Sequence, residues 1–278
     1  MKQTCDLPTP SEIQAEITGL IPRELPFGIC AFSRIANRLL DCRKRGQIPE
    51  NAKSVLLLLF PYLLDEEIYR HANVSRYAVS ADYHTIVGAY LDELIEKLRK
   101  AAPGFSFAAF CDNSPIPEVY AAALSGLGVI GRNGLLIHPV YGSYCFIGEV
   151  VTDLALTPTG NCVKGCPGCG TCEKACPSGA LSGGKPEEKI CLSAVTQQKK
   201  ELSPEQALLI RKQGLAWGCD RCQTVCPLNQ NARTTPLAPF WKTALPLVTV
   251  QTPVEGRAYA WRGEKVIRRN LYLLEKNR

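Results

Sequence analysis

Eight cysteines in this 278-residue chain have the order and spacing of ligands for two iron–sulfur clusters. The first set reads Cys166-x2-Cys169-x2-Cys172-x3-Cys176-Pro177, and the second is Cys191 followed by Cys219-x2-Cys222-x3-Cys226-Pro227. In the first motif a tight loop can point three thiolates at one cube-shaped cluster. A pair of clusters in one protein moves electrons one at a time, so the spacing predicts electron transfer.

The fourth cysteine of such a motif, which precedes a proline, ligates the other cluster in two-cluster ferredoxins. The second motif lacks a leading cysteine of its own, and the upstream Cys191 is the obvious replacement. This rule predicts one [4Fe–4S] cluster on Cys166, Cys169, Cys172 and Cys226, and another on Cys176, Cys191, Cys219 and Cys222. Zinc is the alternative, but zinc sites rarely use a run of three cysteines followed by Cys-Pro.

The other six cysteines carry no clear ligand pattern. Cys162 precedes Cys166 by four residues, which breaks the spacing, and we leave it out of both clusters. The five scattered ones are expected to be mostly small, buried, apolar residues: Cys5, Cys30, Cys42, Cys111 and Cys145. The roles of Cys162, Cys111 and Cys145 stay open.

The composition is that of a folded protein of one or two domains. Hydrophobic residues make up 46% and charged residues 21%, and the net charge of +6 permits an anionic partner without requiring one. The N-terminus has no apolar signal region, and the run from Val55 to Leu64 is too short to cross a bilayer. Cysteines at metal spacing in a long chain without an export signal predict a reducing cytoplasm and no membrane.

Strands and helices are expected to alternate over residues 1–160, which predicts an α/β or α+β domain. The clearest helix is 82–100, where apolar residues recur every three or four positions and form one stripe. A second helix is expected from Ser114-Pro115 to about Ser125, with the proline at the first helical position. Apolar runs of strand length are Phe27–Phe32, Val55–Phe60, Phe105–Phe110, Leu135–Ile137 and Tyr144–Thr152.

Thr157 to Gly160 is a plausible domain boundary. Residues 161–235 would then form a ferredoxin-like module of two [4Fe–4S] clusters, with helices near 187–198 and 204–213. Residues 236–278 would form a C-terminal helical segment. Its part from Glu255 to Arg278 carries seven Arg or Lys residues and is expected to be one basic amphipathic helix or a helix pair.

The chain resembles the epoxyqueuosine reductase family of cobalamin-dependent iron–sulfur enzymes from about Val74 to its end. Besides the eight cysteines, eight strings carry the resemblance: Ser75-Arg76-Tyr77 with Asp82-Tyr83-His84, Asp112-x2-Pro115-x2-Glu118, Gly126-x-Gly128-x-Ile130-Gly131, Gly142-Ser143, Gly148-Glu149, Thr152-Asp153-Leu154, Trp217-Gly218-Cys219-Asp220 and Arg262-Gly263 with Arg268-Arg269. That family usually continues into a helical-repeat domain that holds tRNA. Because this chain stops at Arg278, the resemblance is to a short form.

The resemblance implies that the N-terminal α/β domain binds a corrinoid, cobalamin, beside one cluster. The contacts it implies are Arg76, Tyr77, Asp112, Ile130, Gly131, Ser143 and Tyr144. Electrons from a low-potential donor of the ferredoxin or flavodoxin type would pass through the clusters to the corrinoid. The epoxide of epoxyqueuosine in tRNA would then become the alkene of queuosine, in a chain that we expect to be monomeric.

Asp112 is the residue that the resemblance implies as proton donor to the departing epoxide oxygen. To donate near neutral pH, its carboxyl group would have to be desolvated by the corrinoid and by apolar neighbours such as Phe110 and Ile116. Its position alone favours a simpler role, because Asp-Asn-Ser-Pro is a common helix-entry string in which the aspartate accepts backbone N–H groups.

Two other functions remain open from the sequence. One is a corrinoid-dependent reductase of a different small substrate, similar to a reductive dehalogenase. The other is a non-enzymatic, ferredoxin-like electron carrier. The basic C-terminal segment could contact tRNA phosphates, or it could be a solvated helix packed on the cluster module.

Overall fold

The computed structural model describes residues 10–182 and 186–275, and its chain divides into two interleaved compact units. The sheet unit comprises residues up to Leu59 together with Val87–Leu127 and Ile147–Val163. The cysteine unit comprises Phe60–Ile86, Gly128–Phe146 and Lys164–Arg278. Each unit draws on three separate stretches of chain. The domain boundaries expected at residues 160 and 235 stay a prediction.

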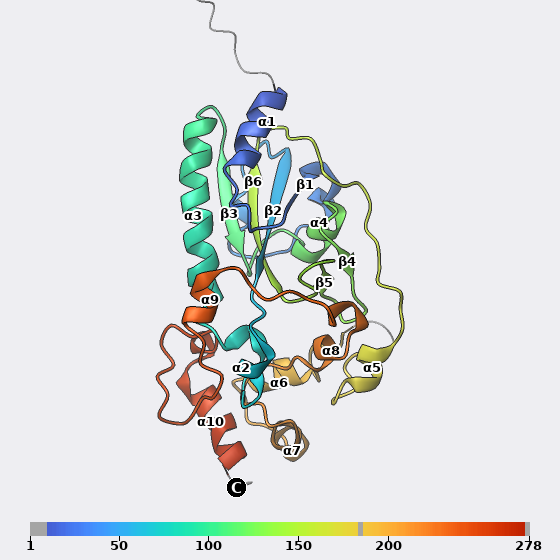
Figure 1. Ribbon diagram of the computed structural model, residues 1–278, viewed down its shortest axis with the longest axis vertical. Coiled ribbons are helices and arrows are strands. Elements are labelled where there is room, and N and C mark those ends of the chain that lie inside the picture. Colours follow the sequence, from blue (N-terminus) through green and yellow to red (C-terminus); the bar gives the residue numbers. More distant parts are fainter. Residues whose placement is uncertain (1–9, 183–185, 276–278) are drawn as a thin grey trace, which may run out of the picture. The chain divides into compact units, whose positions relative to one another are not determined.

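A four-stranded sheet forms the centre of the sheet unit (Figure 1). Its order is β1 (Phe27–Ala31), β2 (Ser54–Pro61), β6 (Cys145–Thr152) and β3 (Phe107–Cys111). β1 runs antiparallel to β2, and β3 runs antiparallel to β6, with Phe110 opposite Glu149. β2 is buried at every residue, as its unbroken apolar sequence predicts for a strand covered on both faces.

Three α-helices accompany this sheet: α1 (Pro10–Gly19), α3 (Tyr83–Ala101) and α4 (Glu118–Leu124). α3 lies on the β3 side and α4 on the β1 side (Figure 1). The apolar stripe of α3 is buried, and its bounds are within one residue of the predicted ones. Short 3-10 turns occur at Phe32–Arg34, Ala36–Arg38 and Arg45–Gln47.

The start of α4 differs from the expectation. The helix begins at Glu118, not at Ser114-Pro115. Asp112 and Asn113 adopt positive φ angles of 49° and 29°, which places a tight turn where the helix was expected. The Ser114 side chain then hydrogen-bonds to Glu149 in β6 and is not a helix cap. A contact across 35 residues of sequence therefore overrides the local signal.

The cysteine unit consists of short elements joined by long loops. Its helices and 3-10 turns are α2 (Glu66–Tyr69), η4 (Arg76–Ala78), α5 (Thr171–Ala175), α6 (Leu192–Gln197), α7 (Pro204–Gln213), α8 (Arg221–Thr224), η5 (Pro227–Asn229), α9 (Ala238–Lys242), η6 (Ala260–Arg262) and α10 (Glu264–Glu275). A small ribbon pairs β4 (Val129–Ile130) with β5 (Leu136–Ile137). α7 has the predicted bounds, because Ser203 and Gln206 form a capping box at its start.

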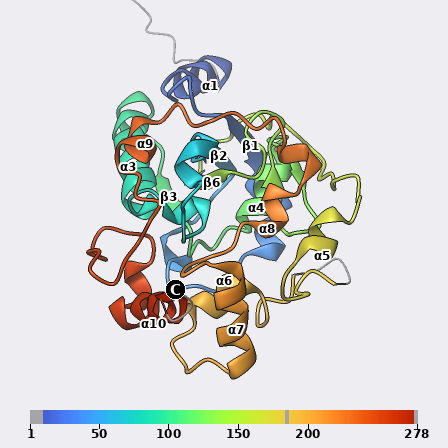
Figure 2. The ribbon, with the colours of Figure 1, turned by 60° about the horizontal axis from the view of Figure 1, so that its bottom comes forward.

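α6, α7 and α10 pack together around Leu192, Val195 and Ile210 (Figure 2). Within the described residues, the segment after Glu255 is one 3-10 turn followed by the single helix α10. The mixed α/β architecture with helices at the C-terminal side confirms the predicted fold class. No helix among the residues placed in the structure has the length and apolar character needed to cross a membrane.

Asn270 of α10 is fully buried, and its amide nitrogen donates to the carbonyls of Thr196, at 2.7 Å, and Ala216, at 2.8 Å. Replacing Asn270 by Leu would keep the branched shape of the side chain but leave both carbonyls without this donor. We expect the free energy of unfolding to fall by about 2–4 kcal/mol, measured by chemical denaturation. Tyr272→Phe on the exposed side of the same helix is the control, and equal stabilities of the two variants would contradict the expectation.

Candidate cofactor and catalytic sites

The first predicted cysteine set lines one cavity of the cysteine unit. Cys166, Cys169, Cys172 and Cys226 all border a cavity of about 110 Å³. Gly131 borders it as well. Ile130 holds one wall in place, because its N–H donates to the Lys164 carbonyl and its carbonyl accepts from the Cys166 N–H, both at 2.9 Å. The four thiols therefore face one space of the kind that a cluster requires, and their assignment to one cluster is a proposal.

The second predicted set is also gathered in the cysteine unit. The charges of Cys176 and Cys191 act on Cys219, and those of Cys191 and Cys219 act on Cys222. Burial, and then these neighbours, raise the pKa of Cys219 to about 11 and that of Cys222 to about 12. Such thiols would be protonated without metal, whereas ligation to iron deprotonates them.

Neither set is arranged as a site for one ion. In the described parts of the chain, no group of three His, Cys, Asp or Glu side chains could hold a single metal ion. A cube-shaped cluster binds each thiolate through a different iron, so its ligands stand farther apart than those of one ion. The Asn133 side chain lines the first cavity and hydrogen-bonds to Cys222, which links the two sets.

Residues between the cysteines of the second motif hold several predicted corrinoid contacts. The buried Asp220 accepts the Arg76 backbone N–H at 2.6 Å and the Gln223 amide at 3.2 Å. Gln223 in turn accepts the Ser143 hydroxyl at 3.0 Å. Asn229 accepts the Ser143 N–H at 2.9 Å and donates to its hydroxyl at 2.8 Å. We call Asp220, Gln223, Ser143 and Asn229 the amide network; it ties this motif to the stretches that carry Arg76 and Ser143.

Burial raises the pKa of Asp220 to about 6, while the N–H and the charge of Arg76 oppose this shift. The Arg76 guanidinium lies over the Tyr69 ring at 4.4 Å and pairs with Glu66 at 2.8 Å. Its conformation is therefore fixed before any ligand binds. The sequence pointed to Arg76 through the family resemblance, but it gave no sign that Asp220 holds it.

Aromatic rings form a layer beside the same stretches. Tyr83 stacks on Phe146 with ring centroids 4.1 Å apart, and Tyr77 meets Phe146 edge-on at 6.5 Å. The Tyr77 hydroxyl accepts the Trp217 indole N–H at 2.7 Å. Ser143 and Tyr144 are almost completely buried, so they support this layer more than they present side chains outward. Flat apolar surface with fixed polar groups suits a corrinoid ring and its amide side chains.

Gly218 allows the close approach on which this arrangement depends. Its φ is +72°, and a Cβ there would collide with the buried Ser75 side chain. Gly218→Ala should therefore lower the free energy of unfolding by about 3 kcal/mol, from backbone strain plus overpacking. Gly214→Ala is the matched control, because Gly214 has a φ of +67° but open space around it. Denaturation curves showing the same loss for both variants would contradict the steric account.

Asp112 belongs to the sheet unit and is exposed at the end of β3. The backbone N–H of Asn113 donates to its Oδ1 at 2.8 Å. The apolar neighbours named from the sequence, Phe110 and Ile116, are buried. The protein alone therefore does not desolvate Asp112. The helix-cap alternative is also not observed, because α4 begins six residues later.

Two further carboxyl groups act on this region. Glu118 and Asp112 repel each other electrostatically, and both act on the fully buried Glu149. Neither glutamate was expected to have a role from the sequence, although both occur in strings that carry the family resemblance. Glu149 could have been noticed, because a glutamate within an apolar, strand-like run is seldom buried unless it has a partner or a function.

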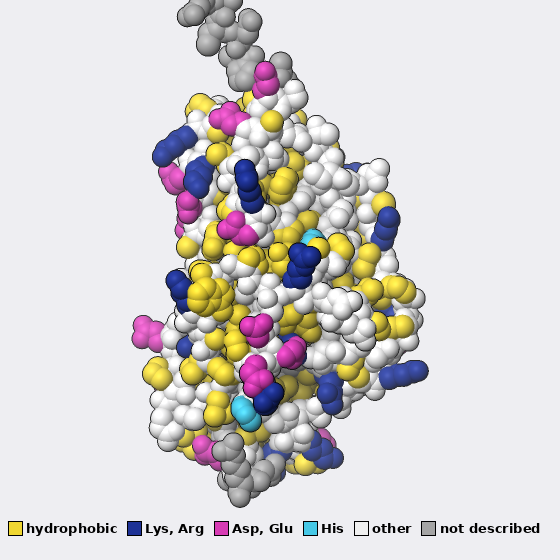
Figure 3. All heavy atoms as spheres, in the orientation of Figure 1, with side chains coloured by type: hydrophobic (Ala, Val, Ile, Leu, Met, Phe, Trp, Pro, Cys, Tyr) yellow, Lys and Arg dark blue, Asp and Glu magenta, His cyan; other side chains and the backbone are white. Residues whose placement is uncertain are grey.

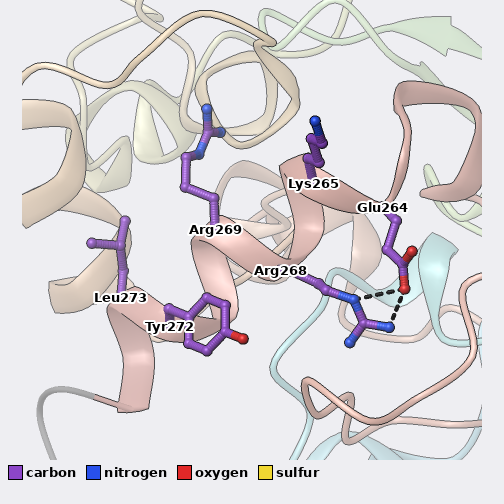
Figure 4. A pocket seen from close by; sticks show the side chains of 6 residues that line it. All are labelled: Glu264, Lys265, Arg268, Arg269, Tyr272 and Leu273. Atoms are coloured by element: carbon purple, nitrogen blue, oxygen red, sulfur yellow. Dashed lines mark hydrogen bonds and ion pairs between the residues drawn. The ribbon is translucent and has the colours of Figure 1, made fainter.

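The basic C-terminal helix presents an open pocket of about 580 Å³ along α10 (Figure 4). Arg268 pairs with Glu264 there, and Arg269 donates to the carbonyls of Gln198 and Lys200 at 3.0 and 2.8 Å. On the face drawn in Figure 3, acidic and basic side chains are interspersed. Two of the basic side chains of this segment are thus already engaged by other groups of the protein.

Comparisons with known proteins agree with this picture. The model "4Fe-4S double cluster binding domain" matches residues 160–229, and "Epoxyqueuosine reductase QueG, DUF1730" matches residues 45–113. The sequence motifs placed the start of the resemblance at about Val74. The family match begins earlier, at residue 45. An epoxyqueuosine reductase of Lactococcus garvieae is 32% identical over 259 residues, 86% of this chain and 73% of that protein.

Other relatives are longer than the matched region. An epoxyqueuosine reductase of Pseudomonas aeruginosa is 38% identical over 168 residues, 59% of this chain and 46% of that protein. The chain likewise covers less than two thirds of the relatives from Gloeobacter violaceus, at 62%, and Listeria monocytogenes, at 57%.

Solved structures show the same fold. The epoxyqueuosine reductase of Streptococcus thermophilus matches with a TM-score of 0.77 and 25% identity, over 96% of this chain and 80% of that one. An epoxyqueuosine reductase with an epoxyqueuosine-modified tRNA stem loop matches with a TM-score of 0.76 and 24% identity, over 95% and 80%. A reductive dehalogenase matches at 0.53 and 16%, over 87% and 35%, which is a likeness of fold alone.

Proposed function

The chain belongs to the epoxyqueuosine reductase family, and we propose that it reduces the epoxide of epoxyqueuosine in tRNA to the alkene of queuosine. One observation carries the proposal: the family match coincides with a cavity lined by four cysteines from both motifs. The relatives are enzymes, so the expectation of an oxidoreductase is confirmed and the non-enzymatic electron carrier is not supported. The fold likeness to a reductive dehalogenase adds no evidence for a different substrate.

The cofactors of this family are [4Fe–4S] clusters and cobalamin. We assign one cluster to Cys166, Cys169, Cys172 and Cys226, and the other to Cys176, Cys191, Cys219 and Cys222. When bound, cobalamin would supply an electron-rich metal centre for the reduction of the epoxide. Arg76, Tyr77, Ile130, Gly131, Ser143 and Tyr144 are proposed to bind and orient it, with the amide network fixing Arg76 and Ser143.

Asp112 is proposed to protonate the oxygen that leaves the substrate. Its carboxyl group is exposed, so a bound cofactor and substrate must exclude water from it before it can act as an acid near neutral pH. The backbone N–H of Asn113 donates to Oδ1 and helps to hold the carboxyl group at the end of β3.

The partners follow from the chemistry. We propose a low-potential ferredoxin or flavodoxin as electron donor, because [4Fe–4S] clusters accept single electrons at low potential. A tRNA substrate and such a donor support a cytoplasmic location, as does the reduced state that fourteen cysteines require. We also propose that one chain suffices, since both cysteine sets are completed within it.

Anaerobic reconstitution tests the proposed function. Protein loaded with iron, sulfide and cobalamin is given a chemical reductant and a tRNA anticodon stem loop that carries epoxyqueuosine. Nucleoside mass spectrometry should then show queuosine. The Lactococcus garvieae relative serves as the positive control. If that enzyme converts the stem loop and the fully loaded chain does not, the proposal is wrong.

A further inference from the structure

Three carboxyl groups of the sheet unit act on one another, from the end of β3, the start of α4 and the middle of β6. Asp112 follows β3, Glu118 is the first residue of α4, and Glu149 lies within β6. The Glu149 side chain has no exposed surface. Ser114 donates its hydroxyl to Glu149 Oε2, whereas Oε1 has no hydrogen-bond partner in the described part of the chain. An ionised carboxylate buried in this way would be expensive, so the site favours a proton.

The ionisation of the two glutamates follows that geometry. Burial, and then the charge of Asp112, raise the pKa of Glu118 to about 7. For Glu149, burial and then the charge of Glu118 raise the pKa well above its usual range, while the Ser114 hydroxyl opposes this. Each glutamate thus holds its proton to higher pH than an ordinary carboxyl group, and Glu118 loses its proton near pH 7.

The other titratable groups around the glutamates do not provide a strong counter-charge. Lys44 is the cation that acts on Glu149, where its effect is the smallest of the five contributions. The thiols of Cys30 and Cys111 also feel Glu149, and burial raises the pKa of both, so they stay neutral. Among these groups, the two glutamates therefore have the largest electrostatic effect on Asp112.

We propose that Glu118 and Glu149 are positioning residues that act through Asp112, holding its loop and keeping a proton in the three-carboxyl group for the oxygen that leaves the substrate. The proposal rests on the proposed function. Ser114 supplies the mechanical link, because its hydroxyl bonds to Glu149 and accepts the Ile116 N–H at 3.1 Å. The turn at Asp112 and Asn113, with positive φ at two non-glycine residues, needs such an anchor.

The proton balance requires a source beyond one aspartate. Converting an epoxide to an alkene consumes two electrons and two protons, and the oxygen departs as water. The electrons come from the low-potential donor through the clusters. Asp112 gives one proton as the carbon–oxygen bond breaks and is left as a carboxylate. Neighbouring carboxyls that share charge with it make its reprotonation favourable, and the partly exposed Glu118 is where solvent protons can enter.

The pH dependence of turnover tests the proposal. Glu118→Gln removes a negative charge beside Asp112, so Asp112 should lose its proton at lower pH. We expect a single-turnover rate close to wild type at pH 6 and at least tenfold lower than wild type at pH 8. Glu118→Asp should restore the wild-type profile in part, and the exposed Glu16→Gln is the matched control. A rate reduced by the same factor at every pH would indicate a merely structural role and overturn the proposal.

A second measurement needs no cofactor or substrate. The infrared band of protonated carboxyl groups can be titrated in the metal-free protein. Wild type should retain protonated carboxyl absorption at pH 7, and the double variant Glu118→Gln, Glu149→Gln should lose it, whereas Glu16→Gln should not. Equal bands in all three would overturn the inference even if the enzyme reduces epoxyqueuosine. If the band behaves as expected but wild type never turns over, the proposed function alone fails. If the double variant does not fold, Glu118→Gln alone replaces it and should lose part of the band.

Discussion

Replacing Asp112 by Asn is expected to lower the single-turnover rate by about 10²–10⁴-fold, the usual contribution of a general acid. The amide keeps the size of the side chain and can still accept the Asn113 N–H at Oδ1, so the turn should persist. What it lacks is the proton for the departing oxygen. Iron content and the visible spectrum of bound cobalamin should match wild type.

The control for Asp112→Asn is Asp41→Asn, an equally exposed aspartate of the sheet unit. Near-normal turnover in Asp112→Asn would remove Asp112 from the chemistry. Loss of cobalamin from the same variant would assign the residue to binding and not to proton transfer. Measuring the rate with loaded enzyme in excess over the stem loop isolates the chemical step, and the visible spectrum of bound cobalamin separates these outcomes.

The second large effect concerns the exchange of cysteines between the motifs. Cys226→Ser should remove about half of the iron and abolish the signal of one cluster, the same one that Cys166→Ser abolishes. Cys176→Ser and Cys219→Ser should abolish the other. The reason is spatial: Cys226 lines the cavity of the first three cysteines, although it follows Cys222 by four residues.

Electron paramagnetic resonance of the reduced variants distinguishes the two clusters. Cys162→Ser is the matched control, because this exposed cysteine lies outside both sets and should leave both signals intact. A Cys226→Ser protein that loses the same signal as Cys219→Ser would show that each motif keeps its own fourth cysteine. Turnover should vanish in every ligand variant, since each one interrupts the electron path.

The residues proposed to perform chemistry are easier to find in the sequence than the residues that hold them. The eight cysteines are recognisable because ligand spacing is local, and α7 because its cap and its closing glycine are local as well. Asp112 needed the family resemblance, since its own string suggested a helix start that the structure does not have. The true start of α4 depends on Ser114 reaching Glu149, a contact no local pattern contains.

The amide network shows the same limit. Ser143 and Gln223 are 80 residues apart in sequence, and Arg76 and Asp220 are 144 apart. Nothing in the sequence around these four residues marks them as partners. Composition and periodicity describe consecutive residues, so they give no sign of stretches that return to the same core, as in the two interleaved units.

Asp220 and Gln223 stand on either side of Cys222, and they also fix Arg76 and Ser143. If Cys222 ligates a cluster as proposed, loss of that cluster should therefore loosen two distant stretches of chain at once. A cell starved of iron, or exposed to oxygen, would accumulate a chain that is easier for proteases to cut near those stretches. We expect the abundance of this protein, and not only its activity, to follow the supply of iron.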